Sequence, residues 1–315
     1  MRRLSVRHER FALIAPFRIA RGVKTAADVV VVTIEADGRS GRGEGVPYPR
    51  YGESVDTAMA AIEAVRGAIE AGADRADLIA LMPAGAARAA VDGALWDLEG
   101  GLTPPPALIS ALTIGIDTPG AMAAAAAKAS AAPLLKIKVD RDDPAARLRA
   151  VRSVAPDARL IVDPNESWDR ATMVAMASVL TQLRVDLLEQ PVPAGEDAWL
   201  EGFNAGVPVC ADESFHGVDD LDAVARLYAC VNVKLDKTGG LTAALALIPA
   251  IRERGLGLMT GCMICSSLSI APALQVAMRS DFVDLDGPLW LASDRAGGVR
   301  DRGGILQPPA QGFWG

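Results

Sequence analysis

The chain has 315 residues, of which 50% are hydrophobic and 23% are charged, so it can bury a large core and is not a disordered polyelectrolyte. Aromatic residues make up only 4%, which predicts an aliphatic core. There are 32 Lys and Arg against 39 Asp and Glu, a formal net charge of −7, and no segment concentrates the basic residues. Because a phosphate backbone is bound by a basic patch, we expect no nucleic-acid partner.

Membrane and secretion signals are also missing from the sequence. No stretch reaches the roughly 18 consecutive apolar residues of a membrane-spanning helix, and the first apolar run, residues 11–15, is too short for a signal peptide. Four cysteines are too few for a disulfide framework, and the Cys262-x-x-Cys265 pair has no second pair that would complete a zinc site. We therefore predict a cytoplasmic protein with reduced thiols and no membrane partner.

The first hundred residues combine strand-like and helical patterns. A β-branched run at 28–35 precedes an Asp37-Gly38 turn, and a loop rich in Gly, Pro and Tyr follows at 41–52. Helical patterns cover 54–71 and 84–99. Strands followed by helices predict a small α+β domain over residues 1–105, ending at a run of three prolines.

From about residue 109, short β-like runs alternate with helix-length segments. Evenly repeated βα units predict an α/β fold in which parallel strands close into a barrel, and a doubly wound open sheet is the alternative. The β-like runs are 112–114, 134–139, 160–162, 185–188, 207–210, 230–235, 257–259 and 282–284.

Polar residues recur at the ends of these runs, at intervals of 22 to 26 residues, about one βα unit. The carboxyl ends of barrel strands meet at one mouth, where active sites are built. We therefore expect the following residues to gather there: Lys138, Asp163, Glu189, Asp212, Lys234, Thr260 and Asp284.

Three carboxylates from adjacent strands, Asp163, Glu189 and Asp212, predict a metal site. Three neighbouring anions repel one another unless a cation lies between them, and hard oxygen ligands without Cys or His favour Mg²⁺. Asn165, two residues after Asp163, falls on the same face of the strand and could support the site.

Lysines flank the carboxylates. Strand alternation places Lys136 and Lys138 on one face, inside the barrel, where burial and crowding of like charges would lower their pKa toward the range of a general base. Lys234 lies four strands further round and would face Lys138. Two bases beside a metal-bound carboxylate predict racemisation or epimerisation, in which one base removes an α-proton and the other returns a proton to the opposite face of an enediolate.

The motifs resemble the muconate-lactonizing subgroup of the enolase superfamily, whose members use Mg²⁺ with a Lys or His base. The resemblance implies a modified (β/α)8 barrel, (β/α)7β, over residues 106–289, a capping domain over 1–105, and a C-terminal tail, 290–315, packed on the cap. The motifs that carry it are Lys136-Ile-Lys138, Asp163-Pro-Asn165, Glu189-Gln-Pro191, Asp212-Glu-Ser214 and 234–240.

Within this subgroup, the chain is most similar to the L-Ala-D/L-Glu epimerases, dipeptide epimerases of murein peptide recycling. The similarity lies in the capping loop 47–54, the segment 261–265 and the Asp284-Leu-Asp286 motif. It implies a Mg²⁺-dependent isomerase with one ion per subunit that inverts the α-carbon of the C-terminal residue of L-Ala-D/L-Glu dipeptides. The implied roles are acid/base catalysis by Lys138 and Lys234, metal binding by Asp163, Glu189 and Asp212, and substrate binding by Lys136, Asp284, Asp286, Thr113 and Arg21, with the Asp pair on the dipeptide ammonium and Arg21 on the distal carboxylate.

Several alternatives stay open at this point. An o-succinylbenzoate synthase or cycloisomerase of the same superfamily would not need the Asp284 and Asp286 pair. A Schiff-base aldolase barrel would not need three carboxylates. A non-catalytic metal-binding barrel is a further alternative, and a homo-oligomer is possible. The sequence does not give the preferred dipeptide side chains or the role of Cys262 and Cys265.

Overall fold

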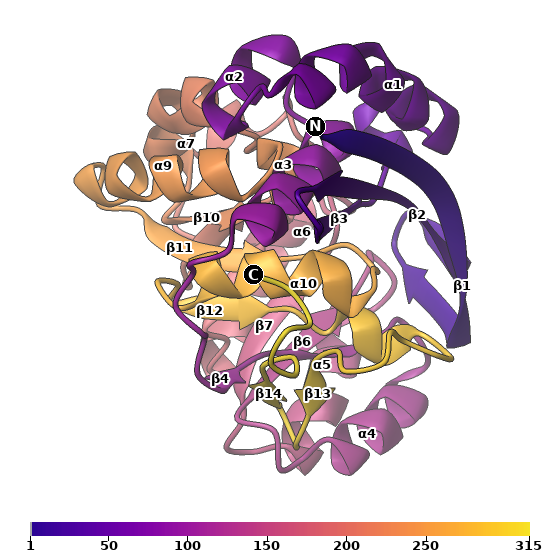
Figure 1. The fold of residues 1–315 in the computed structure, drawn as a ribbon. Coiled ribbons are helices and arrows are strands. Elements are labelled where there is room, and N and C mark those ends of the chain that lie inside the picture. Colours follow the sequence, from indigo (N-terminus) through magenta and orange to yellow (C-terminus); the bar gives the residue numbers. More distant parts are fainter. Residues whose placement is uncertain (1) are drawn as a thin grey trace.

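The computed structural model describes residues 2–315 (Figure 1). Its N-terminal part is an antiparallel sheet in the order β1-β2-β3, against which helices α1 and α3 pack, while α2 packs on α3 and α9 (Leu241–Glu253). The strands are β1 (Arg3–Ile19), β2 (Gly22–Ala36) and β3 (Arg39–Gly45), and the helices are α1 (Val55–Ala71), α2 (Arg75–Leu81) and α3 (Ala86–Glu99), with a 3-10 helix η1 (Pro49–Tyr51) in the loop before α1.

Local sequence explains these elements. The valine run of β2 is fully buried, with Val30 and Val32 in the core formed with the helices of this part and Val29 and Val31 in the core of the second part. The predicted turn joins β2 to β3 with Asp37 at φ 50° and Gly38 at φ 75°, a left-handed pair that favours these residue types. Ser54 caps α1 by accepting a hydrogen bond from the backbone N–H of Thr57, whose side chain in turn accepts from the N–H of Ser54. These local signals explain where strand β2 ends and where helix α1 begins.

The longest strand, β1, was not predicted. It pairs with β2 over most of its length, but it carries charges on both faces, contains Pro16 and shifts register between Ala12 and Phe17. Only Leu4 in it is buried, so no clean alternation of apolar residues marks it. Helix α2 was missed for a similar reason, since it spans two turns and buries only Leu78.

The second part is an eight-stranded parallel sheet in the order β5 to β12, as the βα repeats predicted. A hydrogen bond from Ala111 N to Val283 O at 2.8 Å joins the two edges of this sheet, so the barrel is nearly closed. The alternative of an open doubly wound sheet is therefore wrong. The strands are β5 (Leu112–Ile114), β6 (Leu134–Lys138), β7 (Arg159–Asp163), β8 (Leu187–Glu189), β9 (Val209–Ala211), β10 (Cys230–Val233), β11 (Gly257–Gly261) and β12 (Phe282–Asp284).

Helices surround this barrel (Figure 1). The α-helices are α4 (Pro119–Lys128), α5 (Pro144–Val154), α6 (Arg170–Gln182), α7 (Leu221–Leu227), α8 (Leu235–Thr238), α9 (Leu241–Glu253) and α10 (Ser267–Ala277). Short 3-10 helices are η2 (Ala198–Leu200), η3 (Val218–Asp220) and η4 (Gly287–Trp290). Among residues 2–315, no helix is both long enough and apolar enough to cross a membrane.

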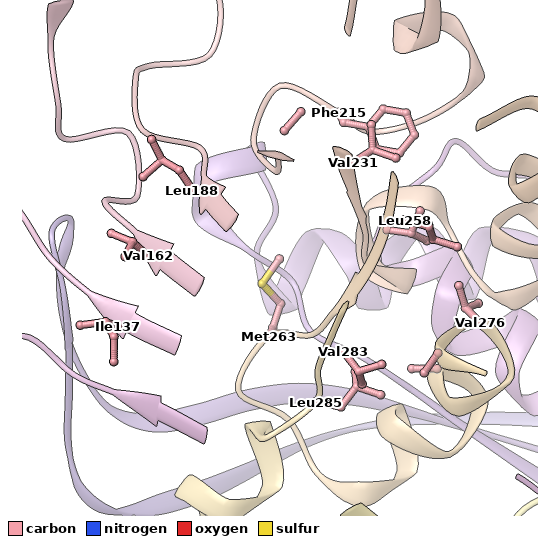
Figure 2. Close-up of a cluster of buried hydrophobic side chains, with 14 of the residues drawn as sticks. Ile137, Val162, Leu188, Phe215, Val231, Leu258, Met263, Val276, Val283 and Leu285 are labelled. Atoms are coloured by element: carbon pink, nitrogen blue, oxygen red, sulfur yellow. The ribbon is translucent and has the colours of Figure 1, made fainter. Parts of the chain in front are cut away.

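Strand alternation divides the barrel residues into two sets. In Figure 2, Ile137, Val162 and Leu188 point away from the ring of strands, into the large aliphatic core shared with the helices. Residues that point inward near the amino ends form a separate apolar cluster that closes the bottom of the barrel: Ala111, Leu134, Ile161, Leu187, Cys210, Cys230 and Met259. Except for Gly261 in β11, the next inward positions toward the carboxyl ends are polar, so the functional side chains lie above an apolar floor.

The C-terminal tail returns to the first domain. Strands β13 (Arg300–Asp301) and β14 (Ile305–Gln307) form a small sheet with β4 (Leu108–Ile109) of the linker. Trp314 Nε1 then donates to Arg42 O at 3.0 Å, and Gly315 N donates to Asp97 Oδ1 at 2.7 Å.

Candidate active site

Charged side chains converge at the carboxyl end of the barrel. Successive strands from β6 to β10, and β12, each contribute at least one, and all are buried. The residues are Lys136 and Lys138 from β6, Asp163 from β7, Glu189 from β8, Asp212 after β9, Lys234 after β10 and Asp284 from β12.

Lys136 lies at the centre of this group with a side-chain exposure of 2%. Its Nζ is 2.6 Å from Glu189 Oε2, 2.7 Å from Asp284 Oδ2 and 3.1 Å from Asp163 Oδ2. One ammonium thus joins carboxylates from three strands, two of them predicted metal ligands.

The two predicted bases pair with carboxylates on different sides of the barrel. Lys138 Nζ donates to Asp163, and Lys234 Nζ lies 2.7 Å from Asp212 Oδ2. Burial alone would raise the pKa of Asp163, but Lys138 and Lys136 outweigh it and lower that pKa to about 2. Because β6 and β10 are four strands apart in a ring of eight, these lysines approach the mouth from opposite walls.

Amide and ammonium groups orient the three carboxylates. Asn165 donates from its backbone N–H to Asp163 Oδ1 at 2.8 Å, as its position in the sequence suggested. Asn232 Nδ2 donates to Glu189 Oε1 at 2.9 Å. Lys237, which the sequence did not single out, donates to both Asp212 Oδ1 and the Asp212 carbonyl. As the side chains stand, residues 2–315 contain no group of three His, Cys, Asp or Glu arranged to hold a metal ion, since lysines pair with the carboxylates.

The Asp-x-Asp pair lies at the eighth strand. Asp284 Oδ2 pairs with Lys136, whereas its buried Oδ1 has no hydrogen-bond partner among residues 2–315. Asp286 Oδ2 accepts from the backbone N–H of Thr113 at 2.7 Å, so Thr113, at which substrate binding was predicted, adjoins the pair. Burial and the neighbouring Asp284 raise the pKa of Asp286 to about 6.

Arg21 follows β1 and reaches over the barrel mouth. Its Nη1 is 2.6 Å from Glu213 Oε1 and 2.9 Å from Glu166 Oε2, and Arg50 holds the other oxygen of Glu166 at 2.7 Å. Burial, followed by the charge of Asp212, raises the pKa of Glu213 to about 7. Arg21 is thus at the site, but it is already paired with two carboxylates of the barrel.

Both domains line one pocket above these groups, with an empty volume of about 630 Å³ that is partly open to solvent. The predicted residues Arg21, Thr113, Lys136, Lys138, Asp212, Lys234, Asp284 and Asp286 line it. Residues that the sequence did not assign to it include Phe17, Lys24, Met263, Ile264 and Trp290, and the capping loop adds Tyr48 and Tyr51. Phe17 and Lys24 belong to the sheet whose first strand the sequence pattern had missed.

Two expectations about the barrel end were wrong. Thr260 does not face the mouth, because its Oγ1 lies 2.6 Å from Ser280 Oγ and it stands opposite the outward-facing Val233 in the ladder. The pKa of Lys136 is not lowered as predicted. Burial by itself would lower it, but the adjacent carboxylates outweigh burial and hold the pKa of Lys136 well above the usual range. The pKa of Lys234, for which no lowering was predicted, is raised above its usual range for the same reason.

Comparison with known families assigns the fold. Residues 1–106 match the mandelate racemase / muconate lactonizing enzyme N-terminal domain, and residues 121–312 match the enolase C-terminal domain-like family. The chain belongs to the enolase superfamily. Its cap and barrel are therefore the two parts that this superfamily combines.

Relatives of this enolase-superfamily chain are epimerases and racemases, which are isomerases. It is 47% identical to the L-Ala-D/L-Glu epimerase of Escherichia coli, over 93% of this chain and 96% of that protein. It is 40% identical to an N-acetyl-D-glutamate racemase of Pseudoalteromonas, over 91% and 95%.

Solved structures agree. An enolase family member from Agrobacterium tumefaciens with homology to dipeptide epimerases, with bound sodium and L-Ala-L-Glu, superposes with a TM-score of 0.97 at 44% identity over all of both chains. A dipeptide epimerase from Enterococcus faecalis, complexed with Mg and L-Leu-L-Tyr, gives a TM-score of 0.89 at 28% identity over 98% of each chain.

Proposed function

We propose that this enolase-superfamily member is a Mg²⁺-dependent dipeptide epimerase that inverts the α-carbon of the C-terminal residue of L-Ala-D/L-Glu. One observation carries the proposal. Lys138 and Lys234 project into the barrel mouth from opposite walls, with buried carboxylates on the three strands between them.

Asp163, Glu189 and Asp212 would hold one Mg²⁺ per subunit. They are oxygen donors only, they come from adjacent strands, and Asn165, Asn232 and Lys237 orient them. The Lys136 ammonium between Asp163 and Glu189 indicates that these carboxylates attract a cation. When bound, the metal supplies positive charge beside the substrate carboxylate, which favours loss of the neighbouring α-proton.

The lysines would move the proton. The deprotonated Nζ of one lysine takes the α-proton, which leaves an enediolate on the substrate, and the ammonium of the other donates a proton to the opposite face. Lys138 and Lys234 exchange these roles when the reaction runs from the other epimer. For Lys234 to act as the base, the Asp212 carboxylate that raises its pKa would bind the metal instead. Lys136, held by three carboxylates, would stay protonated and attract the substrate carboxylate.

The rest of the dipeptide would be held at its charged ends. Asp284 has a buried oxygen without a hydrogen-bond partner, and with Asp286 it would bind the α-ammonium through charge-assisted hydrogen bonds. Arg21 would bind the distal carboxylate of the glutamate from the rim. A substrate of this type fits the recycling of murein peptides, in which L-Ala-D-Glu must be converted to the L-Glu epimer.

Exchange of the glutamate α-proton with deuterium tests the proposal. ¹H NMR in deuterium oxide should show Mg²⁺-dependent loss of the α-proton signal of L-Ala-L-Glu and L-Ala-D-Glu. N-acetyl-glutamate, which has no ammonium, should exchange more slowly. Faster exchange of N-acetyl-glutamate than of every L-Ala-Xaa dipeptide would assign the chain to N-acyl amino acid racemisation instead.

A further inference from the structure

Two aromatic side chains from different domains meet at one end of the pocket. Phe17 on β1 and Trp290 on η4 stack edge to face, with ring centroids 4.6 Å apart and an interplanar angle of 73°. Both rings line the pocket. They are 273 positions apart in the sequence, so only the packing of the cap on the barrel brings them together.

The indole is fixed to the Asp-x-Asp motif. Asp286 is the residue before η4, and Trp290 Nε1 lies 3.4 Å from Asp286 Oδ2. Just beyond the indole, the chain is tied to β1, because Leu291 bridges to Leu13 and Ala292 N donates to Ala12 O at 2.8 Å. The indole of Trp290 is therefore held at a fixed distance from the Asp286 carboxylate and in contact with strand β1 of the cap.

Apolar side chains support the pair from behind. Phe17 and Trp290 pack on a small cluster whose buried members are Ala27, Ile264 and Leu291. A ring with packed neighbours on one side and a hydrogen bond at its edge has little freedom to move out of the way of a ligand.

The positions of the two lysines and of the Asp-x-Asp pair indicate where Phe17 and Trp290 would lie relative to the substrate. Lys138, Lys234, Asp284 and Asp286 all line the pocket. In the proposed reaction, the two lysines would flank the α-carbon that reacts, and the Asp pair would bind the ammonium of the preceding residue. An ammonium bound by Asp286 would lie within about two hydrogen-bond lengths of the indole. The α-carbon of the N-terminal residue is one covalent bond further, so its side chain would meet the rings.

We propose that Phe17 and Trp290 form an aromatic wall that limits the N-terminal residue of the dipeptide to a small side chain. The proposal rests on the proposed dipeptide epimerase function, because it takes the ammonium position from it. The wall leaves no room for a large side chain and offers it no polar group. Dipeptides with N-terminal Ala are therefore accepted, and those with N-terminal Leu or Phe are rejected.

The test measures kcat/KM for α-proton exchange with L-Ala-L-Glu, L-Leu-L-Glu and L-Phe-L-Glu. Trp290→Ala and Phe17→Ala should each shift the ratio of L-Leu-L-Glu to L-Ala-L-Glu by at least about tenfold in favour of the larger residue, the effect of one or more methylenes in an apolar pocket. Trp290→Phe removes the hydrogen bond to Asp286 but keeps a ring, so it should retain most of the discrimination.

The molecule supplies a matched control. Trp199 and Phe203 form another edge-to-face pair, with centroids 5.3 Å apart at 80°, outside the pocket. Trp199→Ala should leave the ratio unchanged. Phe17→Leu serves as a milder variant if the alanine variants do not fold, and it should shift the ratio in the same direction.

The outcomes separate the two proposals. If the wild-type protein exchanges none of the dipeptides, the epimerase function is wrong. If it exchanges L-Ala-L-Glu but none of the folded Phe17 and Trp290 variants changes the ratio, the aromatic wall is wrong and the function stands. Equal wild-type rates for N-terminal Ala and Leu would also overturn the wall.

Discussion

Lys136 Nζ lies 2.6 Å from Glu189 Oε2 at a depth where both side chains are almost fully buried. The same ammonium also contacts Asp163 and Asp284, so a single lysine compensates negative charge from three strands. This relationship makes the mouth of the barrel an electrostatically coupled unit, in which the loss of one charge leaves others buried and unpaired.

Replacement of Lys136 by Met should destabilise the fold strongly. The methionine keeps most of the side-chain volume but leaves three buried carboxylates without their shared cation, at a cost of about 3–5 kcal/mol. Urea denaturation without metal measures this loss, and added Mg²⁺ should recover part of it. Lys128→Met, at an exposed position on α4, is the control. A free energy of unfolding within about 0.5 kcal/mol of wild type would contradict the central role of this ammonium.

Replacement of the two bases should have opposite stereochemical effects. Lys138→Ala should lower α-proton exchange from one epimer of L-Ala-Glu by about 10²–10⁴-fold and affect the other less, and Lys234→Ala should show the reverse preference. Exchange in deuterium oxide, started separately from each epimer, measures both effects. If either variant exchanges both epimers at the wild-type rates, a two-base mechanism cannot operate.

Removal of the proposed metal ligand Glu189 should abolish activity through loss of Mg²⁺ affinity. Glu189→Gln keeps the shape of the side chain and the position that accepts from Asn232, but removes one of the three negative charges. Isothermal titration calorimetry with Mg²⁺ should show a decrease in affinity of at least about tenfold. Asp186→Asn provides the control, since Asp186 precedes β8 at the amino end of the barrel and pairs with Arg159. Unchanged Mg²⁺ binding by Glu189→Gln would place the ion elsewhere.

Asp236 should make stability depend on pH. Its buried carboxyl accepts from Val46 N at 2.8 Å, and burial raises its pKa from 3.8 to about 7. The folded state therefore keeps a proton that the unfolded state has lost between these pH values, so the contribution of Asp236 to stability falls as pH rises from about 4 to about 7. The contribution of Asp236 to stability is most unfavourable above pH 7.

The variant Asp236→Asn should remove this dependence, because its amide oxygen can still accept from Val46 N. Relative to wild type, it should gain stability at pH 8, by up to about 4 kcal/mol, and gain little at pH 4. Urea denaturation at both pH values measures the difference. An equal change at pH 4 and pH 8 would show that Asp236 does not titrate in this range.

The sequence predicted the barrel strands well because their signal is local and repeated. Each strand combines a short apolar run with a polar residue at its end, and alternation along Lys136-Ile-Lys138 already fixes which side chains share a face. Spacing alone misplaced Thr260, because a polar residue at the end of a run can still face outward, and Thr260 stands opposite the outward-facing Val233 in the ladder. Strand β1 gave no such signal and was missed, and with it the position of Phe17.

The sequence by itself determined the repeat of βα units, the inward set of lysines and carboxylates, and the Asp-x-Asp pair, because spacing along the chain controls all three. The tertiary structure alone decided the partners of those charges. Lys136 joins β6 to β8 and β12, Arg21 reaches Glu213, and Phe17 meets Trp290. The physical reason is that ion pairs and ring contacts depend on how the barrel closes and where the cap rests on it. Neither the closure of the barrel nor the position of the cap produces a periodic pattern in the sequence.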